Sequence, residues 1–341
     1  MMGRQSSSAA RRVVVVVCAA MVVAAAAAQK YNAVYNFGDS ITDTGNLCTN
    51  GRVVVDFLAS KFGLPFLPPS KSTSADFKKG ANMAITGATA MDANFFRSLG
   101  LSDKIWNNGP ISFQIQWFQQ ISSSVCGQNC KSYLANSLFV FGEFGGNDYN
   151  AMLFGGYSAD QASTYTSQIV DTISSGVEKL IAMGAVDVVV PGVLPIGCFP
   201  IYLTIYGTSS SSDYDSLGCL KKFNDLSTNH NNQLKTKISA LQSKYKSARI
   251  MYADFYSGVY DMVRNPGNYG FSTVFETCCG SGGGKFNYNN NARCGMSGAS
   301  ACSNPASHLS WDGIHLTEAA YKQITDGWLN GPYCSPAILH S

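Results

Sequence analysis

The 341-residue chain carries 24 lysine and arginine residues against 21 aspartate and glutamate residues, and only 13% of its residues are charged. Average soluble proteins contain about 25% charged residues. This weakly charged composition has no lysine and arginine block after the first 30 residues. It argues against nucleic acid and anionic membrane surfaces as partners, because both are bound through clusters of basic side chains.

The first 28 residues are typical of a cleaved secretory signal peptide. Three arginines precede an uninterrupted apolar stretch at 13–28, which ends in small residues. This order predicts cleavage near Ala28 or Gln29. A retained membrane anchor is the alternative, but the stretch is shorter than the roughly 20 residues that span a bilayer. Loss of the leader leaves 21 basic against 21 acidic residues, and we expect 29–341 to form a single domain without a stable membrane anchor.

Short apolar runs along the chain predict strands that are buried on both faces. Continuous stretches of β-branched and aromatic residues are what parallel sheets require. Between the second and third run, residues 162–185 repeat apolar side chains at helical spacing, and Gly184 is the expected C-cap. A helix that joins two strands makes a βαβ unit. The four runs are 33–38, 138–143, 186–192 and 249–254.

Two further helices are predicted in the second half of the chain. One covers 220–245, and the other covers 317–329 with Thr317 as its N-cap. The alternation of strands and helices predicts one doubly wound α/β domain of roughly 310 residues. In such sheets ligands bind at the carboxyl ends of the strands, so chemistry is expected in the loops that follow them.

Cysteine usage agrees with a secreted protein. The predicted cleavage removes Cys18 and leaves ten cysteines, and an even number behind a signal peptide predicts disulfides. Their connectivity stays open at this stage. A four-thiolate metal site is the alternative for four of them, but the paired Cys-x-x-Cys spacing of zinc ribbons is absent and no metal is expected. The four are Cys278, Cys279, Cys294 and Cys302.

The histidines narrow the search for a catalytic base. Only His315 follows an acid by three residues, in Asp312-Gly-Ile-His315, and one irregular turn can then orient both side chains the same way. A hydrogen-bond network at the entry of a helix is the alternative for this pair. His230 is expected in solvent on a helix, His308 has no acid at the matching position, and His340 belongs to the tail.

Ser40 follows the first predicted strand, in "NFGDSITDTGN". Taken alone, Gly-Asp-Ser after a strand is more typical of a turn and a helix N-cap than of a nucleophile. A nucleophilic serine needs a base and donors for the oxyanion. The pair at 312 and 315 offers the base, while Gly87 in "GANMAITGATA" and Asn147 in "GEFGGNDYN" offer donors. We predict that these loops leave the same edge of the sheet.

The side chains around these motifs are assigned mainly structural roles. The two carboxylates beside Ser40 lie on one tight turn, where they cannot flank a substrate bond as glycosidase carboxylates do. Three aromatic residues near Asn147 are candidates for a pocket lining as well as for the core. The acids are Asp39 and Asp43, expected to form hydrogen bonds in the turn, and Asp148, expected to be structural. The aromatic candidates are Phe141, Phe144 and Tyr149, and core packing is the favoured role for Phe141.

The four blocks "NFGDSITDTGN", "GANMAITGATA", "GEFGGNDYN" and "WDGIHLTEAAY", in this order, resemble the plant-type GDSL esterase/lipases of the SGNH hydrolase superfamily. The resemblance runs from Tyr31 to about Tyr333. It implies a flavodoxin-like, three-layer α/β/α fold with a mainly parallel central sheet. By resemblance, the catalytic residues are Ser40, Asp312 and His315, and the oxyanion donors are the Ser40 N–H, the Gly87 N–H and the Asn147 side chain.

The resemblance also implies a function. A GDSL-type carboxylic ester hydrolase is expected, a secreted serine esterase that acts through an acyl-enzyme without a cofactor. Its substrate would be a small-molecule or polysaccharide ester, such as a short acyl or acetyl ester of a lipid, polysaccharide or secondary metabolite. The location would be the apoplast or cell wall, with the vacuole as an alternative. The alternative functions are a cell-wall acyltransferase or polysaccharide deacetylase with the same triad, and a catalytically impaired binding protein.

One segment departs from the family pattern. Related sequences generally carry a proline- and aromatic-rich stretch between the Asn-Leu-Cys and Gly-Arg-Val-Val-Val-Asp-Phe parts of this chain, where it is absent. Its absence predicts a missing wall beside the nucleophile loop and a missing partner for Cys48.

Overall fold

The computed structural model describes residues 30–45, 48–105 and 109–340. The predicted signal peptide at 1–28 lies outside the described residues, so its cleavage and the domain boundary that follows it stay predictions. Within the described ranges, none of the helices is both long and apolar enough to cross a membrane.

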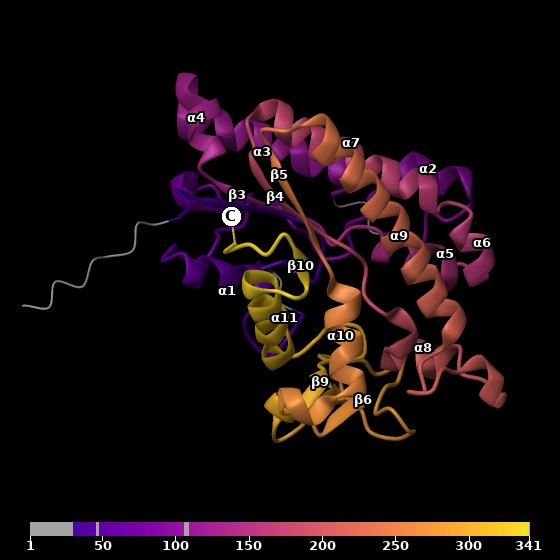
Figure 1. Cartoon of the computed structure of the whole chain (residues 1–341). Coiled ribbons are helices and arrows are strands. Elements are labelled where there is room, and N and C mark those ends of the chain that lie inside the picture. The colour runs from indigo at the N-terminus through magenta and orange to yellow at the C-terminus, as the bar shows by residue number, and fades with distance from the viewer. Residues whose placement is uncertain (1–29, 46–47, 106–108, 341) are drawn as a thin grey trace, which may run out of the picture.

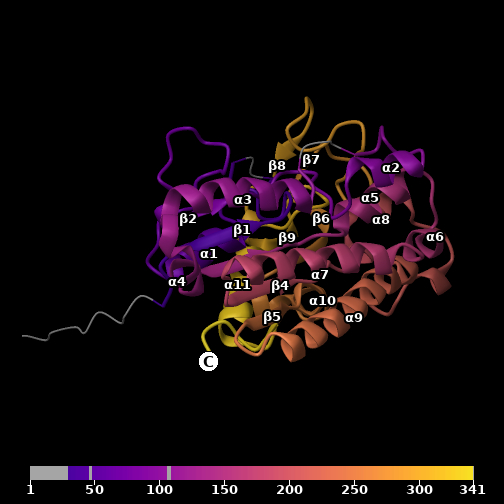
Figure 2. The ribbon, with the colours of Figure 1, turned by 90° about the horizontal axis from the view of Figure 1, so that it is seen from above.

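A six-stranded sheet lies at the centre of the fold (Figures 1 and 2). Its order is β10-β5-β4-β3-β1-β2, with β10 antiparallel to β5 and all other neighbours parallel. Without β10 the order is 2-1-3-4-5, which is the flavodoxin-like arrangement. The strands are β1 (Val34–Phe37), β2 (Gly80–Asn82), β3 (Leu138–Phe141), β4 (Asp187–Pro191), β5 (Arg249–Ala253) and β10 (Cys334–Ser335).

The four strands predicted from apolar runs are confirmed, and the sequence analysis missed β2 and β10. Every residue of β1 and β3 is buried, which accounts for their uninterrupted apolar character. By contrast, β2 is a Gly-Ala-Asn segment, and Asn82 accepts a hydrogen bond at 2.7 Å from the Asn36 amide of β1. Since β2 has three residues and β10 has two, neither is long enough to show a periodic pattern.

Helices cover both faces of the sheet, which confirms the three-layer α/β/α architecture (Figure 1). One layer contains α3 (Ile111–Cys126), α7 (Thr166–Met183) and α9 (Lys221–Lys244). The opposite layer contains α1 (Val54–Lys61), α10 (Phe255–Arg264) and α11 (Glu318–Asn330). The smaller elements are α2 (Ala93–Ser98), α4 (Cys130–Ala135), α5 (Gly146–Phe154), α6 (Ala159–Ser163), α8 (Pro200–Ile205), β6 (Thr273–Thr277), β7 (Cys279–Gly280), β8 (Ser300–Ala301) and β9 (His308–Ser310).

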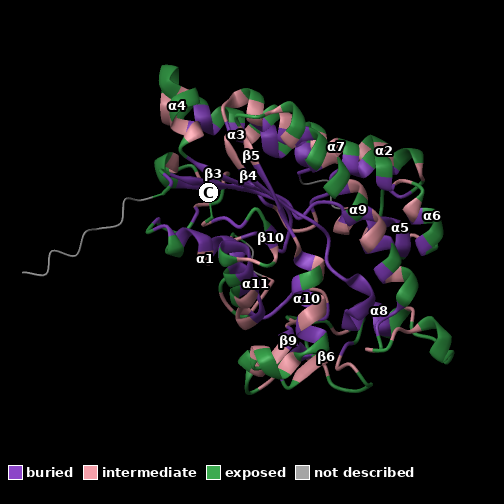
Figure 3. Cartoon of the chain, viewed as in Figure 1, coloured by how far each residue is buried: buried purple, intermediate pink, exposed green. Residues whose placement is uncertain are grey.

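The predicted helices have the expected ends and buried faces (Figure 3). The α7 helix stops at Gly184, whose φ of 119° is the left-handed conformation that glycine adopts readily at a C-cap. The Thr317 side chain caps α11 by accepting a hydrogen bond from the Ala320 N–H. The apolar face of α7 packs against the core through Ile169, Val170, Ile173, Val177 and Leu180.

The prediction that His230 lies in solvent is wrong. The side chain is fully buried on the inner face of α9, between Leu226 and Leu234. Its Nδ1 lies 2.9 Å from the Tyr149 hydroxyl, and the two rings meet edge to face. Burial lowers the pKa of His230 to about 3, so the imidazole is neutral and belongs to the core.

The disulfides predicted from the cysteine count are confirmed. Four bridges join described residues, and Cys48 and Cys334 belong to none of the four. The four cysteines considered as a metal site form two of the bridges instead, and three of these cysteines lie in or next to the short antiparallel strands β7 and β8. The bridges are Cys126–Cys130, Cys198–Cys219, Cys278–Cys302 and Cys279–Cys294.

Candidate active site

The turn that carries Ser40 follows β1 directly. Gly38 has a φ of +145°, and a Cβ there would lie 2.8 Å from the Thr42 hydroxyl, so the position requires glycine. The Gln114 side chain of α3 binds both the N–H and the carbonyl of Gly38, at 2.9 and 2.8 Å. No helix starts at Ser40, since the first helix of the described residues begins at Val54. Ser40 is therefore a turn residue and not an N-cap.

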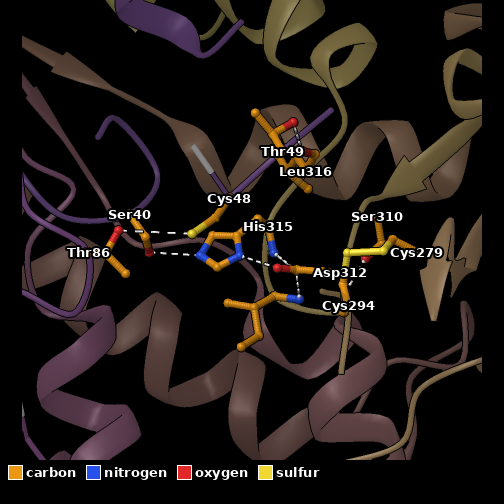
Figure 4. Close-up of polar contacts among 12 residues, drawn as sticks. Ser40, Cys48, Thr49, Thr86, Cys279, Cys294, Ser310, Asp312, His315 and Leu316 are labelled. Atoms are coloured by element: carbon orange, nitrogen blue, oxygen red, sulfur yellow. Dashed lines mark hydrogen bonds and ion pairs between the residues drawn. A yellow bond between two sulfur atoms is a disulfide. The ribbon is translucent and has the colours of Figure 1, made fainter. Parts of the chain in front are cut away.

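Asp312 and His315 lie in the loop between β9 and α11, and the structure brings both to Ser40 (Figure 4). The Oδ1 atom of Asp312 accepts the N–H groups of Ile314 and His315 at 2.9 and 2.8 Å, which closes one tight turn. Its Oδ2 atom lies 2.7 Å from His315 Nδ1. On the other side of the ring, Nε2 lies 2.8 Å from Ser40 Oγ. With the proton on Nδ1, Nε2 can accept the Ser40 hydroxyl.

The charges and hydrogen bonds around His315 and Asp312 favour the protonated imidazole and so make His315 a stronger base. Burial alone would lower the pKa of His315, but the charge and hydrogen bond of Asp312, together with the charge of Asp39, raise the pKa above its ordinary 6.5. Burial opposes ionisation of Asp312, yet the charge of His315 and three hydrogen bonds hold the pKa of Asp312 below its ordinary 3.8. The pair is therefore built to stabilise an imidazolium.

Gly87 and Asn147 border the same cavity as Ser40. Gly87 has a φ of 81° and follows β2 in the chain. Asn147 lies in the first turn of α5, directly after β3. Its amide nitrogen donates to Asp39 Oδ2 at 2.6 Å and to the Ala88 carbonyl at 3.0 Å. The loops after β1, β2 and β3 thus meet at one edge, where the strand order reverses direction along the chain.

The acids near these loops hold the backbone in place, as expected. Asp39 Oδ1 accepts the Ile41 N–H at 3.0 Å within the nucleophile turn. Asp43 binds the N–H and the hydroxyl of Thr86 at 2.9 and 3.0 Å, which ties this turn to the loop of Gly87. Asp148 accepts the N–H groups of Ala90 and Met91 at 2.8 and 2.9 Å.

The cavity has a volume of about 390 Å³. The aromatic candidates Phe141, Phe144 and Tyr149 do not line it, because all three are buried in the core. The sequence analysis did not assign a role to the other residues that form its walls, which come from α5 and from separate loops and of which only Asn150 and Ile314 lie within the quoted motifs. These are Lys104, Ile105, Asn150, Phe154, Tyr288, Arg293 and Ile314.

One wall of the cavity is held in place by a disulfide bond. Cys294 borders the cavity and is bridged to Cys279, whose N–H donates to the Trp311 carbonyl at 2.6 Å, just ahead of Asp312 (Figure 4). On the side of the shortened segment, Cys48 also borders the cavity, and its sulfur lies 3.9 Å from the Thr86 hydroxyl. Residues 46 and 47 of that segment lie outside the described residues.

A Ser–His–Asp arrangement at the carboxyl edge of a three-layer α/β sheet is typical of serine hydrolases. Comparison with known proteins narrows this class. The model of the GDSL-like lipase/acylhydrolase family matches residues 34–328. A GDSL esterase/lipase of Arabidopsis thaliana is 38% identical over 90% of this chain and 92% of its own length. The sinapine esterase of Brassica napus is 37% identical over 91% of this chain and 88% of its own.

The chain therefore belongs to the GDSL-like lipase/acylhydrolase family, and it is a carboxylic ester hydrolase. The resemblance found from the four sequence blocks is confirmed. Among solved structures, a phospholipase A1 from Streptomyces albidoflavus is 12% identical with a TM-score of 0.41, and the match covers 86% of this chain and 95% of that one.

Proposed function

We propose that the protein is a secreted serine esterase that hydrolyses carboxylic esters through an acyl-enzyme on Ser40. The observation that carries the proposal is the unbroken chain from Asp312 to His315 to Ser40, with contacts of 2.7 and 2.8 Å. This geometry is that of a nucleophile, a general base and a group that orients the base. The predicted leader and the disulfides support secretion into an oxidising compartment such as the apoplast or cell wall.

The reaction follows from the positions of the atoms. His315 Nε2 takes the hydroxyl proton of Ser40 while Oγ bonds to the ester carbonyl carbon, and the carbonyl oxygen becomes an oxyanion. Collapse of this intermediate breaks the bond to the alcohol oxygen, which leaves with the proton from His315. Water then attacks the acyl carbon and loses a proton to His315. Collapse of this second intermediate breaks the bond to Ser40 Oγ, which takes the proton back from His315, and the free acid leaves.

We assign the stabilisation of the oxyanion to three hydrogen-bond donors, the Ser40 N–H, the Gly87 N–H and the Asn147 amide. Asn147 already donates to two acceptors, so an oxyanion must replace one of them. The bond to the neutral Ala88 carbonyl is the longer, at 3.0 Å, whereas the 2.6 Å bond joins the amide to the Asp39 carboxyl. Hydrogen bonds to a charged group are the stronger kind. The Ala88 bond is therefore the one that substrate replaces.

The cavity supports a substrate larger than an acetyl ester of a small alcohol. A volume of about 390 Å³ lies in the range of pockets that enclose whole small molecules. Its wall contains the apolar side chains of Ile105, Phe154 and Ile314 as well as polar groups such as Asn150. An ester of a secondary metabolite, lipid or polysaccharide with several carbons on one side of the ester bond fits these walls.

The test is a chain-length panel of aryl esters offered to the mature protein, with Ser40→Ala as the decisive variant. We expect equal amounts of free acid and alcohol, an acyl group on Ser40 by mass spectrometry, and a loss of at least about 10³-fold in kcat for Ser40→Ala. Transfer of the acyl group to an added sugar alcohol would identify an acyltransferase instead.

A matched serine control is available outside the cavity. Ser158 caps α6 on the exposed surface and borders no part of the site, so Ser158→Ala is expected to retain the wild-type rate. Hydrolysis that survives Ser40→Ala undiminished would rule out the proposed mechanism.

A further inference from the structure

Three carboxyl groups are buried directly behind the nucleophile turn. Asp39, Glu143 and Asp148 are at most 3% exposed. None of them takes part in an ion pair with lysine or arginine in the described part of the chain. A buried carboxylate without a cation requires hydrogen-bond donors, or it takes up a proton.

The donors are distributed unequally among the three groups. Asp39 accepts the Ile41 N–H and the Asn147 amide. Asp148 accepts two backbone N–H groups, at 2.8 and 2.9 Å. Among the residues that the structure describes, Glu143 accepts only the Gly146 N–H, at 3.2 Å, and its second hydrogen-bond contact is the carboxyl of Asp39. The group with the fewest donors therefore faces another acid.

Two carboxyl groups in buried contact cannot both be ionised, because like charges at this distance repel strongly in a medium of low dielectric constant. The pair must share one proton. Asp39 already receives two donors that stabilise its charge, so the proton belongs on Glu143.

We propose that Glu143 is a positioning residue, whose protonated carboxyl donates a hydrogen bond to Asp39 and thereby holds Asp39 against the amide of Asn147. The inference rests on the proposed function, since it assigns Asn147 to the oxyanion. Glu143 lies in the loop between β3 and α5, and its carboxyl packs so closely on Gly146 that a Cβ there would lie 2.8 Å from Oε1. The same loop thus supplies both Asn147 and the acid that fixes the partner of Asn147.

The surroundings of Glu143 favour its neutral form. Burial raises the pKa of Glu143 well above its ordinary 4.5, and the charge and hydrogen bond of Asp39, followed by the charge of Asp148, raise it further. The remaining titratable groups near the pair are Tyr149 of α5, Tyr202 of α8, His230 of α9 and, facing Asp39, Asp43 and His315. Burial keeps both tyrosines protonated and His230 neutral.

Loss of the Glu143 proton should lower the rate at alkaline pH. When Glu143 loses its proton, two carboxylates face each other and Asp39 no longer has a fixed position. The Asn147 amide then loses its anchor, and the interaction with the oxyanion weakens. Because this interaction forms mainly in the transition state, kcat should fall while KM stays nearly constant.

The main variant is Glu143→Gln, which keeps a donor toward Asp39 and an acceptor for the Gly146 N–H but has no proton to lose. We expect its kcat to stay within about threefold of wild type at neutral pH and the alkaline fall in kcat to be absent. Glu143→Leu lacks the donor, and its kcat should drop roughly 10- to 100-fold with KM nearly unchanged. Asp148→Asn removes the other buried acid and should retain the alkaline fall.

Infrared spectroscopy tests the proton without using turnover. The wild-type spectrum at neutral pH should show a protonated-carboxyl band to which Asp148 also contributes, because burial raises the pKa of Asp148 to about 7. The contribution of Glu143 should be missing in Glu143→Gln and should remain in Asp148→Asn. In the wild type itself, this contribution should fade over the pH range in which kcat falls, so the test does not depend on the folding of a variant. Absence of this contribution at neutral pH, or alkaline profiles that superimpose for wild type and Glu143→Gln, would overturn the inference. Neither result bears on the proposed function, which Ser40→Ala tests separately.

Discussion

The two sides of the proposed active site are held in different ways. Ser40 and Asn147 follow β1 and β3, which are central, fully buried strands of the parallel sheet. Asp312 and His315 lie outside that sheet, in a loop closed by the Trp311 N–H on the His315 carbonyl at 2.8 Å and flanked by two disulfides. The core therefore sets the position of the proposed nucleophile, whereas local turns and cross-links set the position of the proposed base. Changes on the loop side should alter the chemistry with little effect on overall stability.

The largest effect is expected from Asp312→Asn, which alters the loop side alone. The carbonyl oxygen of the new asparagine side chain can still accept the two N–H groups that close the turn. Its amide then donates to His315 Nδ1, which moves the ring proton to Nε2, so that the base can no longer accept the proton of Ser40. We expect kcat to fall roughly 10³- to 10⁴-fold, with a melting temperature close to that of the wild type.

The control for this variant is Asp92→Asn. Asp92 caps α2 at an exposed position, and asparagine caps helices equally well, so rate and melting temperature should both be retained. A decrease of less than about tenfold in kcat for Asp312→Asn would contradict the assigned tautomer.

The sheet side was also the side that the sequence predicted well. Its four predicted strands are continuous apolar runs, and Ser40 and Asn147 each follow such a run within a few residues, so local pattern and the rule for carboxyl ends suffice for these two positions. On the loop side, only the Asp312-to-His315 spacing is local. Phe154, Tyr288 and the other walls of the cavity come together through tertiary contacts between distant segments, which a single sequence does not reveal.

His230 shows where a usable signal was overlooked. Its neighbours four residues away on α9 are Leu226 and Leu234, and both are buried. This spacing places the imidazole on the apolar face of the helix. The polar neighbours in sequence suggested solvent instead, and the hydroxyl that compensates the buried ring, on Tyr149 of α5, is 81 residues away in the chain.

The second-largest effect is expected when the Cys279–Cys294 disulfide, which holds one wall of the cavity, is removed. In the double variant Cys279→Ser with Cys294→Ser, the 15-residue cross-link is lost, which corresponds to roughly 3 kcal/mol by loop entropy. Because Cys294 and Arg293 border the cavity, we expect KM to rise about three- to tenfold while kcat changes less, as for a loss of uniform binding. Steady-state kinetics and chemical unfolding measure the two parts.

The matched control removes a disulfide far from the site. Cys126 and Cys130 are bridged across four residues where α3 meets α4. Their replacement by serine should leave KM at the wild-type value. An equal rise in KM for both pairs would show that the wall beside Asp312 has no special dependence on its cross-link.

The smallest effect is expected in the pH dependence of kcat/KM, which reports on the two sides of the site separately. His315 must be neutral to accept the proton of Ser40, and its pKa lies above the ordinary 6.5 because Asp312 and Asp39 favour the charged ring. Protonation therefore removes the base as pH falls, so kcat/KM should decline about tenfold per pH unit below a midpoint higher than 6.5. An unperturbed imidazole would place this midpoint at about 6.5. Glu143→Gln leaves the charge of Asp39 in place and should not move this acid midpoint, although it removes the alkaline fall. A midpoint at or below 6.5, or one that shifts with Glu143→Gln, would mean that the loop and the sheet do not control the base and the oxyanion independently.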